Sequence, residues 1–428
     1  MASIAQGGGG SADEGTALLV PSIFNLVNNV AGAGLLTLSY GMSKGTGWVS
    51  SILLCCVLGA ISCHTFILIG DCCSMLNERD FKGVWSRTIS ESTTYVVDVI
   101  IGLMCLAASI IYSGVLGDVS TEMLNAKGIK TTRAGNISII TALVLFPLSL
   151  LKNLSALSFT SVLGFASILY TVAFIAYRSF DGSYSLGSPA SSPGEFLSPE
   201  LVDKMALVPK FDRASKFSVS FSSLVLMSNL GLAFIAHYNA PSYYREMRKK
   251  SEFKAMVRCS FLVLTCVYAV TMATGWRTFG DNCLGNIILN YHPSDYLSTL
   301  GRAATGISIL FGFPLTFCGV RDSVLSVSSH FKINYLTTRR TLVVVMMLSI
   351  VTFVASAVED ISLVVGVTGA TMGAAIVYIL PPIMYSRAIA VTHGKDSELY
   401  RRSRGNYALV PIGVVFAVLG VWMTVKGD

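Results

Sequence analysis

Charged residues are scarce in this chain. They make up 13% of its 428 residues, whereas 53% are hydrophobic, and the mean hydropathy is +0.64. A soluble domain of this size needs a larger charged surface, so the composition indicates a polytopic membrane protein. The net charge of +7 lies mainly in the loops between apolar stretches. We therefore attribute it to membrane topology rather than to nucleic-acid binding.

The chain also lacks the motifs of several enzymes and pumps. Its five histidines form no His-Glu-x-x-His pattern, and no Gly-Lys-Ser/Thr phosphate-binding loop occurs. The ten cysteines include no Cys-x-x-Cys pair, and most lie within apolar stretches, where a thiol is a small apolar side chain. We therefore expect no enzyme, no direct drive by ATP, no metal cluster and no disulfide framework.

Apolar stretches of the length that crosses a bilayer, about 20 residues, occur about eleven times. They run over residues 18–42, 48–75, 95–124, 137–151, 157–177, 217–238, 255–276, 297–320, 341–357, 361–385 and 409–425. Lysine and arginine concentrate in alternate loops, beginning with the loop after the second stretch, which predicts a cytosolic amino end and an external carboxyl end.

The regions outside the apolar stretches suggest a simple organisation. We expect residues 1–17 to be a cytosolic tail without a cleavable signal peptide, and residues 18–428 to form one transmembrane domain. The segment 178–216 is rich in Gly, Ser and Pro and is predicted to be an exposed outer loop. Asn136, in an Asn-Ile-Ser triplet, is a candidate glycan acceptor. Glu14, Leu18 and Leu19 resemble an acidic dileucine sorting signal, although the simpler interpretation is that the leucines begin the first helix.

The first apolar stretch is interrupted by Asn28, Asn29, Gly32, Ala33 and Gly34. In hydrocarbon every freed backbone N–H and C=O group needs a partner, so an interrupted helix is stable only where it is buried in protein or lines a polar cavity. In secondary transporters such interruptions hold the solute and its coupling cation near the bilayer midplane. Close packing of helices through small residues is the alternative interpretation.

The sixth apolar stretch is interrupted in a similar way. Its small and polar residues are Asn229, Gly231, Ala233, His237, Asn239 and Pro241. Two interrupted stretches five apart are typical of transporters built from two five-helix inverted repeats. On this hypothesis the repeats cover about residues 18–177 and 217–385, with the outer loop 178–216 between them, and helix eleven, about 409–425, is an addition.

The sequence around the first interruption closely resembles the first-helix signature of the amino acid/auxin permease family. It reads Phe24-Asn-Leu-Val-Asn-Asn-Val-Ala-Gly-Ala-Gly-Leu-Leu-Thr-Leu-Ser-Tyr-Gly-Met42, and further similar segments are 233–241, 275–280 and 366–370. Within the family, the sodium-coupled neutral amino acid transporters are the most similar group. The resemblance implies an all-α polytopic membrane protein of about 11 transmembrane helices. It also implies a LeuT-like (APC superfamily) 5+5 inverted repeat with broken helices 1 and 6 and an extra helix 11.

The resemblance also implies a function. We expect a secondary active transporter of amino acids that works by alternating access, is coupled to protons or sodium, and resides in the plasma membrane or a lysosomal or vacuolar membrane. Neutral amino acids are favoured because no fixed charge obviously lines the pocket. The expected partners are the amino acid and the lipid bilayer. An amino acid sensor (transceptor) or an uncoupled facilitator is the alternative, and the short tail argues against docking of a signalling partner.

The resemblance places the substrate between the two interruptions. The N–H groups of Gly32, Ala33 and Gly34 are expected to receive the substrate carboxylate, because glycine allows close approach of the backbone. The carbonyl groups of residues 233–236 are expected to receive its ammonium group. The predicted substrate-binding residues are therefore Gly32, Ala33, Gly34, Ala233, Phe234 and Ala236, with Tyr112 and Ser109 as guesses for the side-chain pocket.

A coupling cation is expected beside the first interruption, at Asn28 and the carbonyl group of Ala31. Capping of the unwound segment is the alternative role for Asn28. Sodium-coupled relatives have a hydroxyl-bearing residue just before the position of Pro314, where this chain has Leu310 or Gly312. Ser308 or Thr305 would supply that oxygen only after a change of register.

Loss of a ligand would weaken a sodium site and favour a proton as the coupling ion. His237 and Asp118 are the candidate proton carriers, because histidine titrates near neutral pH and Asp118 is a carboxylate within the membrane. A packing role is the simpler interpretation of His237. The outer loops differ from the family as well. A cystine joins the loops after helices five and seven in related transporters, whereas this chain has only Cys283 there.

Overall fold

The computed structural model describes residues 15–150, 160–187, 192–205, 208–213 and 215–426. The regular secondary structure in this part of the chain is helical, with two isolated β-bridges, Ala17 to Met247 and Lys210 to Gly280. Among the described residues, eight helices are long and apolar enough to cross a bilayer, and a bent pair of helices would make nine. The all-α membrane fold is therefore confirmed, whereas the total of eleven crossings stays a prediction.

The helices follow the predicted apolar stretches in chain order. They are α1 (Leu19–Val30), η1 (Ala33–Thr37) and α2 (Leu38–Ser43); α3 (Trp48–Leu76); α5 (Tyr95–Ala126); α6 (Arg133–Ile140), η3 (Thr141–Leu145) and α7 (Phe146–Ser149); α8 (Thr160–Phe180); α9 (Ser223–Ala233) and α10 (Ala240–Glu246); α11 (Phe253–Phe279); α12 (Tyr296–His330); α14 (Arg340–Ala357); α15 (Ile361–Thr368), η10 (Gly369–Ile379) and α16 (Leu380–His393); and α18 (Leu409–Lys426). The short helices α4 (Phe81–Thr88) and α17 (Glu398–Ser403) lie in loops.

Several predicted boundaries differ from the structure, among them those of the eighth and sixth stretches. Helix α12 continues past residue 320 to His330 and includes Arg321, whose Nε lies 2.8 Å from Oδ1 of Asp322. The sixth stretch becomes helical only at Ser223 rather than at 217, and Phe217 is exposed. The length of an apolar stretch therefore did not locate the carboxyl end of α12 or the amino end of α9. A helix can continue through a charged residue, and an apolar residue need not be helical.

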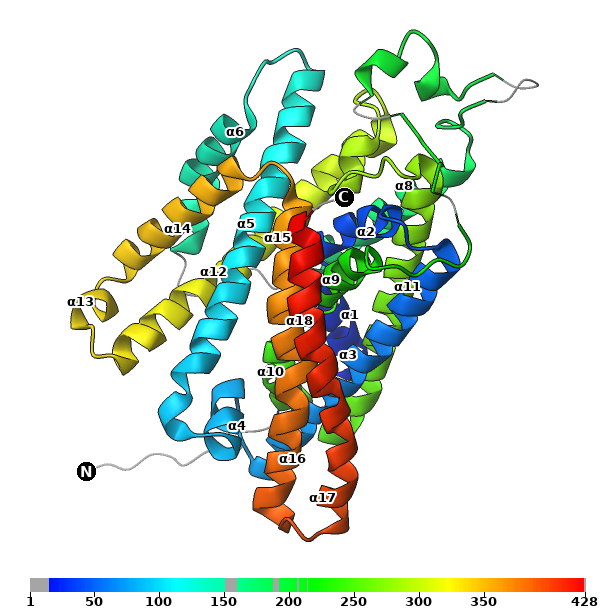
Figure 1. The fold of residues 1–428 in the computed structure, drawn as a ribbon. Coiled ribbons are helices and arrows are strands. Elements are labelled where there is room, and N and C mark those ends of the chain that lie inside the picture. The colour runs from blue at the N-terminus through cyan, green and yellow to red at the C-terminus, as the bar shows by residue number, and fades with distance from the viewer. Residues whose placement is uncertain (1–14, 151–159, 188–191, 206–207, 214, 427–428) are drawn as a thin grey trace, which may run out of the picture.

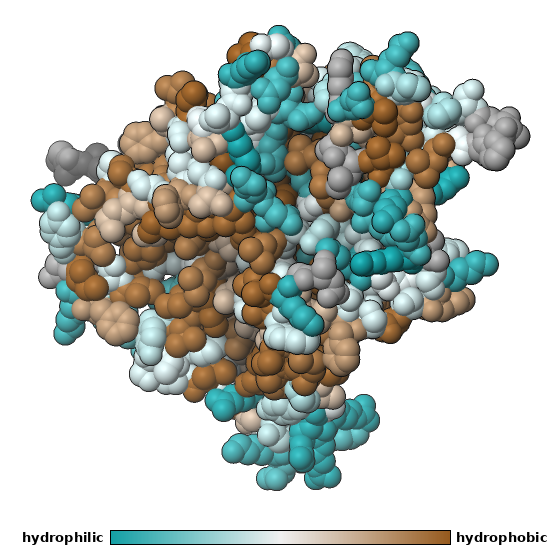
Figure 2. Space-filling model, turned by 45° about the horizontal axis from the view of Figure 1, so that its top comes forward, coloured by the Kyte–Doolittle hydropathy of each residue, from teal (hydrophilic) through white to brown (hydrophobic). Residues whose placement is uncertain are grey.

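The arrangement of loops agrees with the predicted sidedness. Figure 1 shows α4 and α17 at the bottom of the molecule and the loop after α8 at the top, so two loops predicted to be cytosolic lie opposite the predicted outer loop. Figure 2 shows hydrophobic residues over the middle of the molecule and hydrophilic groups at its ends. Helix α18 contributes Val414, Val418 and Trp422, whose side chains are exposed. Such a band is the surface expected to contact lipid.

Two predictions about loop residues are clarified by local contacts. Asn136 is buried at the start of α6, and its Nδ2 donates to the hydroxyl groups of Thr121 and Thr131 at 2.8 and 2.9 Å. This amide is therefore not presented for glycosylation in this structure. Leu19 begins α1 and so belongs to the first helix. Just before it, Ala17 pairs with the end of α10, since its N–H group donates to the Glu246 carbonyl group at 2.9 Å.

The outer loops after α8 and α11 are joined by hydrogen bonds rather than by a cystine. The Lys210 N–H group donates to the Phe279 carbonyl group at 3.2 Å, and the Asp281 N–H group donates to the Lys210 carbonyl group at 2.6 Å. Nearby, Nδ2 of Asn282 donates to the carbonyl group of Val208 at 2.8 Å. Cys283 is buried, which raises the pKa of its thiol. These contacts connect the two loops that a cystine joins in related transporters.

Replacement of Gly280 by alanine is expected to destabilise the protein. Gly280 has φ +60°, ψ −127°, a conformation essentially restricted to glycine, and a Cβ atom there would overlap the carbonyl oxygen of Lys210. The backbone strain alone costs about 1–3 kcal/mol. Gly394→Ala is the control, because Gly394 has φ +83° but nothing within 4 Å of an added Cβ. We expect Gly280→Ala to lower the Tm of the purified protein clearly more than Gly394→Ala does, and equal shifts would show that the loop contact contributes nothing.

Candidate substrate and cation sites

The interruption in the first helix lies between Val30 and Ala33. Helix α1 ends at Val30, Gly32 is extended with φ −91° and ψ −153°, and η1 begins at Ala33. The two halves are bent by 51°. Carbonyl groups at the end of α1 and N–H groups at the start of η1 have no partner within their own helices, so the bend presents both kinds of polar group at one place.

The second interruption lies between α9 and α10. Helix α9 ends at Ala233, residues 234–236 are not helical, and a short 3-10 turn, η7 (His237–Asn239), leads into α10. Pro241 occupies the first turn of α10, where its missing N–H group costs no helical hydrogen bond.

Two side chains hold the interrupted helices together. The hydroxyl group of Tyr268, on α11, donates to the Ala233 carbonyl group at 2.6 Å and lies 3.1 Å from the Val30 carbonyl oxygen. Nδ2 of Asn229, on α9, donates to the carbonyl group of Thr37 in η1 at 3.0 Å. Both side chains are fully buried. Sequence reasoning missed Tyr268, because an aromatic residue in an apolar stretch carries no sign that its hydroxyl group reaches two freed carbonyls.

A cavity of about 600 Å³ begins at these interruptions. Five predicted substrate residues line it together: Gly32, Ala33, Gly34, Ala233 and Tyr112. Helices α5 and α12 contribute further lining residues that the sequence did not indicate, namely Met104, Cys105, Ala108, Gly312 and Thr316. The lining extends to Asn25 in α1 and Glu246 at the end of α10. The cavity therefore extends from the interruptions towards the start of α1 and the end of α10, which lie on the side predicted to be cytosolic.

Three other predicted substrate residues are not part of this lining. Phe234 is fully buried and its ring contacts those of Phe261 and Tyr268, with centroids 6.1 and 4.9 Å apart. Ala236 is likewise fully buried, and Ser109 donates to the Cys105 carbonyl group within α5 at 2.8 Å. In the part of the chain that the structure describes, Ile235, Tyr238 and Asn239 line the cavity instead.

A smaller cavity of about 80 Å³ adjoins the larger one at the α1 interruption, where Asn28, Gly32, Ala33 and Tyr112 line both cavities. Asn28 and Ala31 line the smaller cavity together with hydroxyl-bearing residues of two helices, Ser167 and Thr171 of α8 and Thr305 and Ser308 of α12. The expected cation residues Asn28, Ala31 and Ser308 thus line one cavity. Amide, carbonyl and hydroxyl oxygens are the ligands preferred by hard cations.

The hydroxyl groups of α8 are oriented in a way that suits a cation. Ser167 donates its proton to the Leu163 carbonyl group at 2.8 Å, and Thr171 donates to the Ser167 carbonyl group at 2.9 Å. Their oxygen lone pairs therefore remain free to accept, and Oγ1 of Thr171 lies 3.3 Å from Oγ1 of Thr305. Ser167 and Thr171 were not predicted from the sequence. Because they lie four positions apart in an apolar helix, they share one face, and this spacing could have indicated them.

The two candidate proton carriers lie away from these cavities. Within the described residues, His237 is outside the lining of both; it is fully buried, and its Nε2 lies 3.0 Å from the Ser62 carbonyl oxygen. Its ring also packs against Phe66, with centroids 5.5 Å apart. Asp118 forms an ion pair with Arg133 at 2.5 Å. Both side chains therefore have structural partners, and neither is grouped with Asn28.

We expect Asp118→Asn to lower stability without changing the pH dependence of uptake. The substitution leaves the guanidinium group of Arg133 without its anion in a largely buried position, which costs about 3–5 kcal/mol. If Asp118 carried the coupling proton, the pH profile of uptake would flatten or shift instead. The measurements are the Tm of the purified variant and uptake between pH 5 and pH 8, normalised to the amount of folded protein.

The membrane helices around the interrupted first helix have a LeuT-like fold, since two solved structures are similar to the chain over most of its length. The chain is similar to MhsT in complex with L-phenylalanine, with a TM-score of 0.54, 11% sequence identity, and coverage of 96% of this chain and 99% of that one. It is also similar to Mhp1, a nucleobase-cation-symport-1 family transporter, with a TM-score of 0.56, 11% identity, and coverage of 96% and 91%. At this identity the likeness shows the fold alone.

The chain belongs to the family described as transmembrane amino acid transporter protein, whose model matches residues 16–426. It is 25% identical over 422 residues to vacuolar amino acid transporter 5 of Schizosaccharomyces pombe, covering 95% of this chain and 94% of the relative. It is 24% identical over 376 residues to putative sodium-coupled neutral amino acid transporter 11 of Danio rerio, covering 86% and 78%. The predicted family is confirmed, and because its relatives are transporters the protein is a multi-pass membrane transporter rather than an enzyme.

Proposed function

We propose that this protein is a secondary active transporter that carries neutral amino acids by alternating access, coupled to a cation at the site lined by Asn28 and Ser308. The observation that carries the proposal is that the α1 interruption lines two adjoining cavities. Gly32 and Ala33 line both of them; Gly34 and Ala233 line the larger one, and the hydroxyl groups of α8 and α12 line the smaller one. Substrate and cation would thus bind the same short stretch of backbone.

The polarity of the interrupted helices supports this assignment of ligands. The start of η1 and α2 carries the positive end of a helix dipole and suits a carboxylate, whereas the end of α1 carries the negative end and suits a cation. An amino acid zwitterion presents both signs, and its ammonium group would contact the freed carbonyl group of Ala233. A cation bound at Asn28 would stabilise the carboxylate through the shared backbone, so each ligand would raise the affinity for the other.

The lining favours neutral substrates. Among the described residues that line the larger cavity, the single charged side chain is Glu246, at the end of α10 and away from the interruptions. A cationic or anionic amino acid would bring a net charge into this low-dielectric site without a fixed partner, at a large desolvation cost. The names of the relatives, vacuolar and sodium-coupled, support residence in the plasma membrane or in a vacuolar or lysosomal membrane.

The donor set of the smaller cavity supports sodium as the cation. Oxygen atoms from Asn28, Ala31, Ser167, Thr171, Thr305 and Ser308 suit a sodium ion, whereas among the described residues no histidine or carboxylate side chain lines the smaller cavity. Sodium therefore takes precedence over the proton in this proposal. Coupling to protons, an uncoupled facilitator and a sensor remain the alternatives that the experiment must separate.

The test is uptake of labelled amino acids into proteoliposomes that hold the purified protein, with sodium and proton gradients imposed separately. Accumulation of neutral amino acids driven by the sodium gradient alone is the expected result, with little accumulation of lysine or glutamate. Accumulation driven by protons alone would overturn the sodium site. Equilibration without accumulation would indicate a facilitator, and binding without uptake would indicate a sensor.

A further inference from the structure

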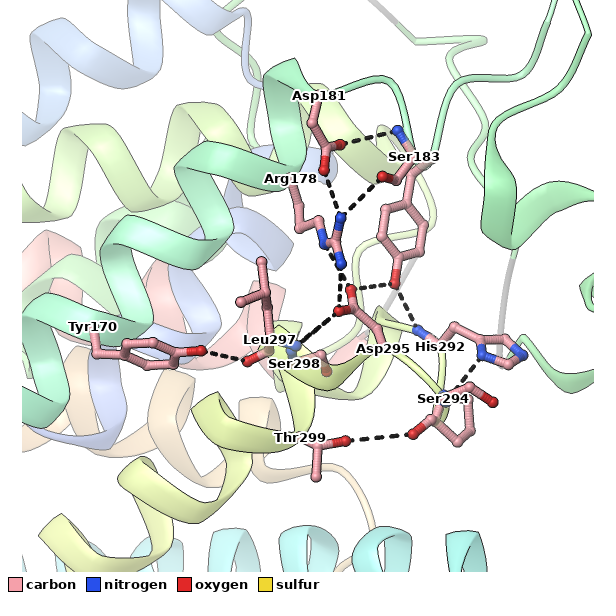
Figure 3. A network of polar contacts seen from close by, with 12 residues as sticks. Tyr170, Arg178, Asp181, Ser183, His292, Ser294, Asp295, Leu297, Ser298 and Thr299 are labelled. Carbon is pink, nitrogen blue, oxygen red and sulfur yellow. Dashed lines mark hydrogen bonds and ion pairs between the residues drawn. The ribbon is translucent and has the colours of Figure 1, made fainter.

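The carboxylate group of Asp295 is the centre of a polar network at the outer end of α8 and α12. Figure 3 shows the guanidinium group of Arg178 directed at it. Nε and Nη2 of Arg178 donate to its two oxygens at 2.9 and 2.7 Å, and the hydroxyl group of Tyr184 donates at 3.0 Å. Asp295 also caps α12, because its Oδ1 accepts from the N–H groups of Leu297 and Ser298. The side chain of Asp295 is completely buried.

Arg178 is fixed on its other side as well. Its Nη1 donates to the carboxylate group of Asp181 at 2.6 Å and to the hydroxyl group of Ser183 at 3.0 Å. Burial raises the pKa of Tyr184, so its phenol keeps its proton and remains a donor. Paired, fork-like hydrogen bonds between a guanidinium and a carboxylate group are short and directional. The network therefore sets the spacing and the rotation of α8 relative to α12 at their outer ends.

The network lies at one end of a continuous seam between the two helices. On α8 the residues at positions 178, 174, 171 and 167 recur every three or four residues and so share one face. Phe174 packs where a Cβ on Gly301 would overlap its ring, and Thr171 contacts Thr305 at 3.3 Å. Thr171 lies two helical turns, about 10 Å, below Arg178. The seam thus leads from the ion pair directly to the hydroxyl groups of the smaller cavity.

We propose that Arg178 and Asp295 are positioning residues that hold α8 and α12 at the separation required for cation binding at Asn28, Thr171 and Ser308. This inference rests on the proposed cation site. Neither Arg178 nor Asp295 touches the cation, and both act through the seam. A small change in helix spacing would alter every oxygen–cation distance across the smaller cavity. The amino acid depends less on α8, because no described residue of α8 lines the larger cavity in which it would bind.

The ion pair at the inner end of α12 offers a matched control. Nζ of Lys82, on α4, donates to Asp98 of α5 at 2.7 Å and to the hydroxyl group of Ser326 on α12 at 2.9 Å. This pair also anchors α12 through charge-assisted contacts, but it has no contact with α8 among the described residues. Asp98→Asn therefore removes an anchor of the same helix without loosening the seam.

The experiment measures sodium-dependent uptake of a neutral amino acid by full-length protein in proteoliposomes. We expect Asp295→Asn to raise the half-saturating sodium concentration by about 10- to 100-fold, the range found when outer-shell partners of metal ligands are removed. The KM for the amino acid at saturating sodium should change less than about twofold. Tyr184→Phe removes one hydrogen bond and should raise the half-saturating concentration about threefold. Tyr184→Phe provides the test if the Asp295→Asn variant does not fold.

Binding is followed independently of transport by the rise in Tm on replacing choline chloride with sodium chloride, which reports cation affinity directly. Tyr184→Phe should reduce this rise, and Asp98→Asn should leave it as in the unaltered protein. Equal effects of Asp98→Asn and Tyr184→Phe, or a loss of maximal rate with unchanged sodium affinity, would overturn the positioning role alone. If the unaltered protein shows no sodium response in either measurement, the cation site fails and this inference fails with it.

Discussion

Replacement of Gly32 by valine is expected to reduce amino acid uptake by at least about a hundredfold while the protein remains folded. The backbone at Gly32, φ −91° and ψ −153°, is extended and open to any residue. An added Cβ atom would lie 2.8 Å from the hydroxyl oxygen of Tyr112, which is the far end of a side chain and has room to move into the cavity. The two methyl groups of valine would then cover the backbone N–H groups offered to the substrate carboxylate. A hundredfold loss corresponds to about 2.8 kcal/mol, close to the value of a hydrogen bond to a charged group.

The measurement is the initial rate of uptake in proteoliposomes, normalised to folded protein by size-exclusion chromatography and Tm. Gly405→Val is the matched control, because nothing lies within 4 Å of a Cβ added at Gly405, and its uptake should be unchanged. Combining Gly32→Val with Tyr112→Phe relieves the contact with the hydroxyl group but leaves the N–H groups covered. The double variant should therefore stay inactive. Recovery of uptake in the double variant would show that the contact, rather than the carboxylate site, had caused the loss.

Replacement of Asn28 by leucine is expected to abolish accumulation driven by sodium, with a rise of at least about thirtyfold in the half-saturating sodium concentration. Leucine has the same branching and the same number of side-chain heavy atoms as asparagine but offers no oxygen ligand. Gly164 of α8 lies directly against the carboxamide group, since a Cβ there would be 2.7 Å from Oδ1 of Asn28. Gly164 thus packs against Asn28 at the smaller cavity. We expect that no neighbouring side chain replaces the oxygen ligand that is lost when Asn28 is substituted.

Substitution of two serines distinguishes the loss of a cation ligand from the loss of a buried hydroxyl group elsewhere. Ser308 lines the smaller cavity, whereas Ser109 is buried in α5 and its hydroxyl group donates to the Cys105 carbonyl group. Ser308→Ala should raise the half-saturating sodium concentration, and Ser109→Ala should not. Unchanged sodium dependence in both Asn28→Leu and Ser308→Ala would place the coupling ion elsewhere. Uptake that responds to pH rather than to sodium would indicate His237 as the carrier of a coupling proton.

The substrate half of the site could be predicted because its requirement is local. Gly32, Ala33 and Gly34 interrupt an apolar stretch, and in hydrocarbon such an interruption must be buried against protein or line a cavity. The structure places all three on the larger cavity together with Ala233 and Tyr112. Phe234 and Ala236 were expected there from the family resemblance; both are fully buried and do not line the cavity, whereas Ile235 between them does.

The cation half was only partly predictable. Asn28 and Ala31 follow from the interruption, but the partners of that segment depend on which faces of α8 and α12 meet it. A shift of one residue rotates a helix by about 100°. A motif alignment on Pro314 pointed to Leu310 or Gly312; Gly312 lines the smaller cavity but has no side-chain oxygen, and Thr305 and Ser308 line it as well. Ser167 and Thr171 went unnoticed for the same reason.

The amino-acid sequence by itself determined that this protein lies in a lipid bilayer, that it is an all-α membrane protein and to which family it belongs. Hydropathy, interruptions in the apolar stretches and the first-helix motif are all properties of consecutive residues. The sequence also located the interrupted backbone that two cavities share. Only the tertiary structure decided which side chains complete the site, since contacts between Tyr268 and two distant carbonyl groups, or between Arg178 and Asp295, depend on helix rotation and crossing. The same packing set His237 and Asp118 apart from the cavities, because burial and ion pairing are properties of neighbours in space.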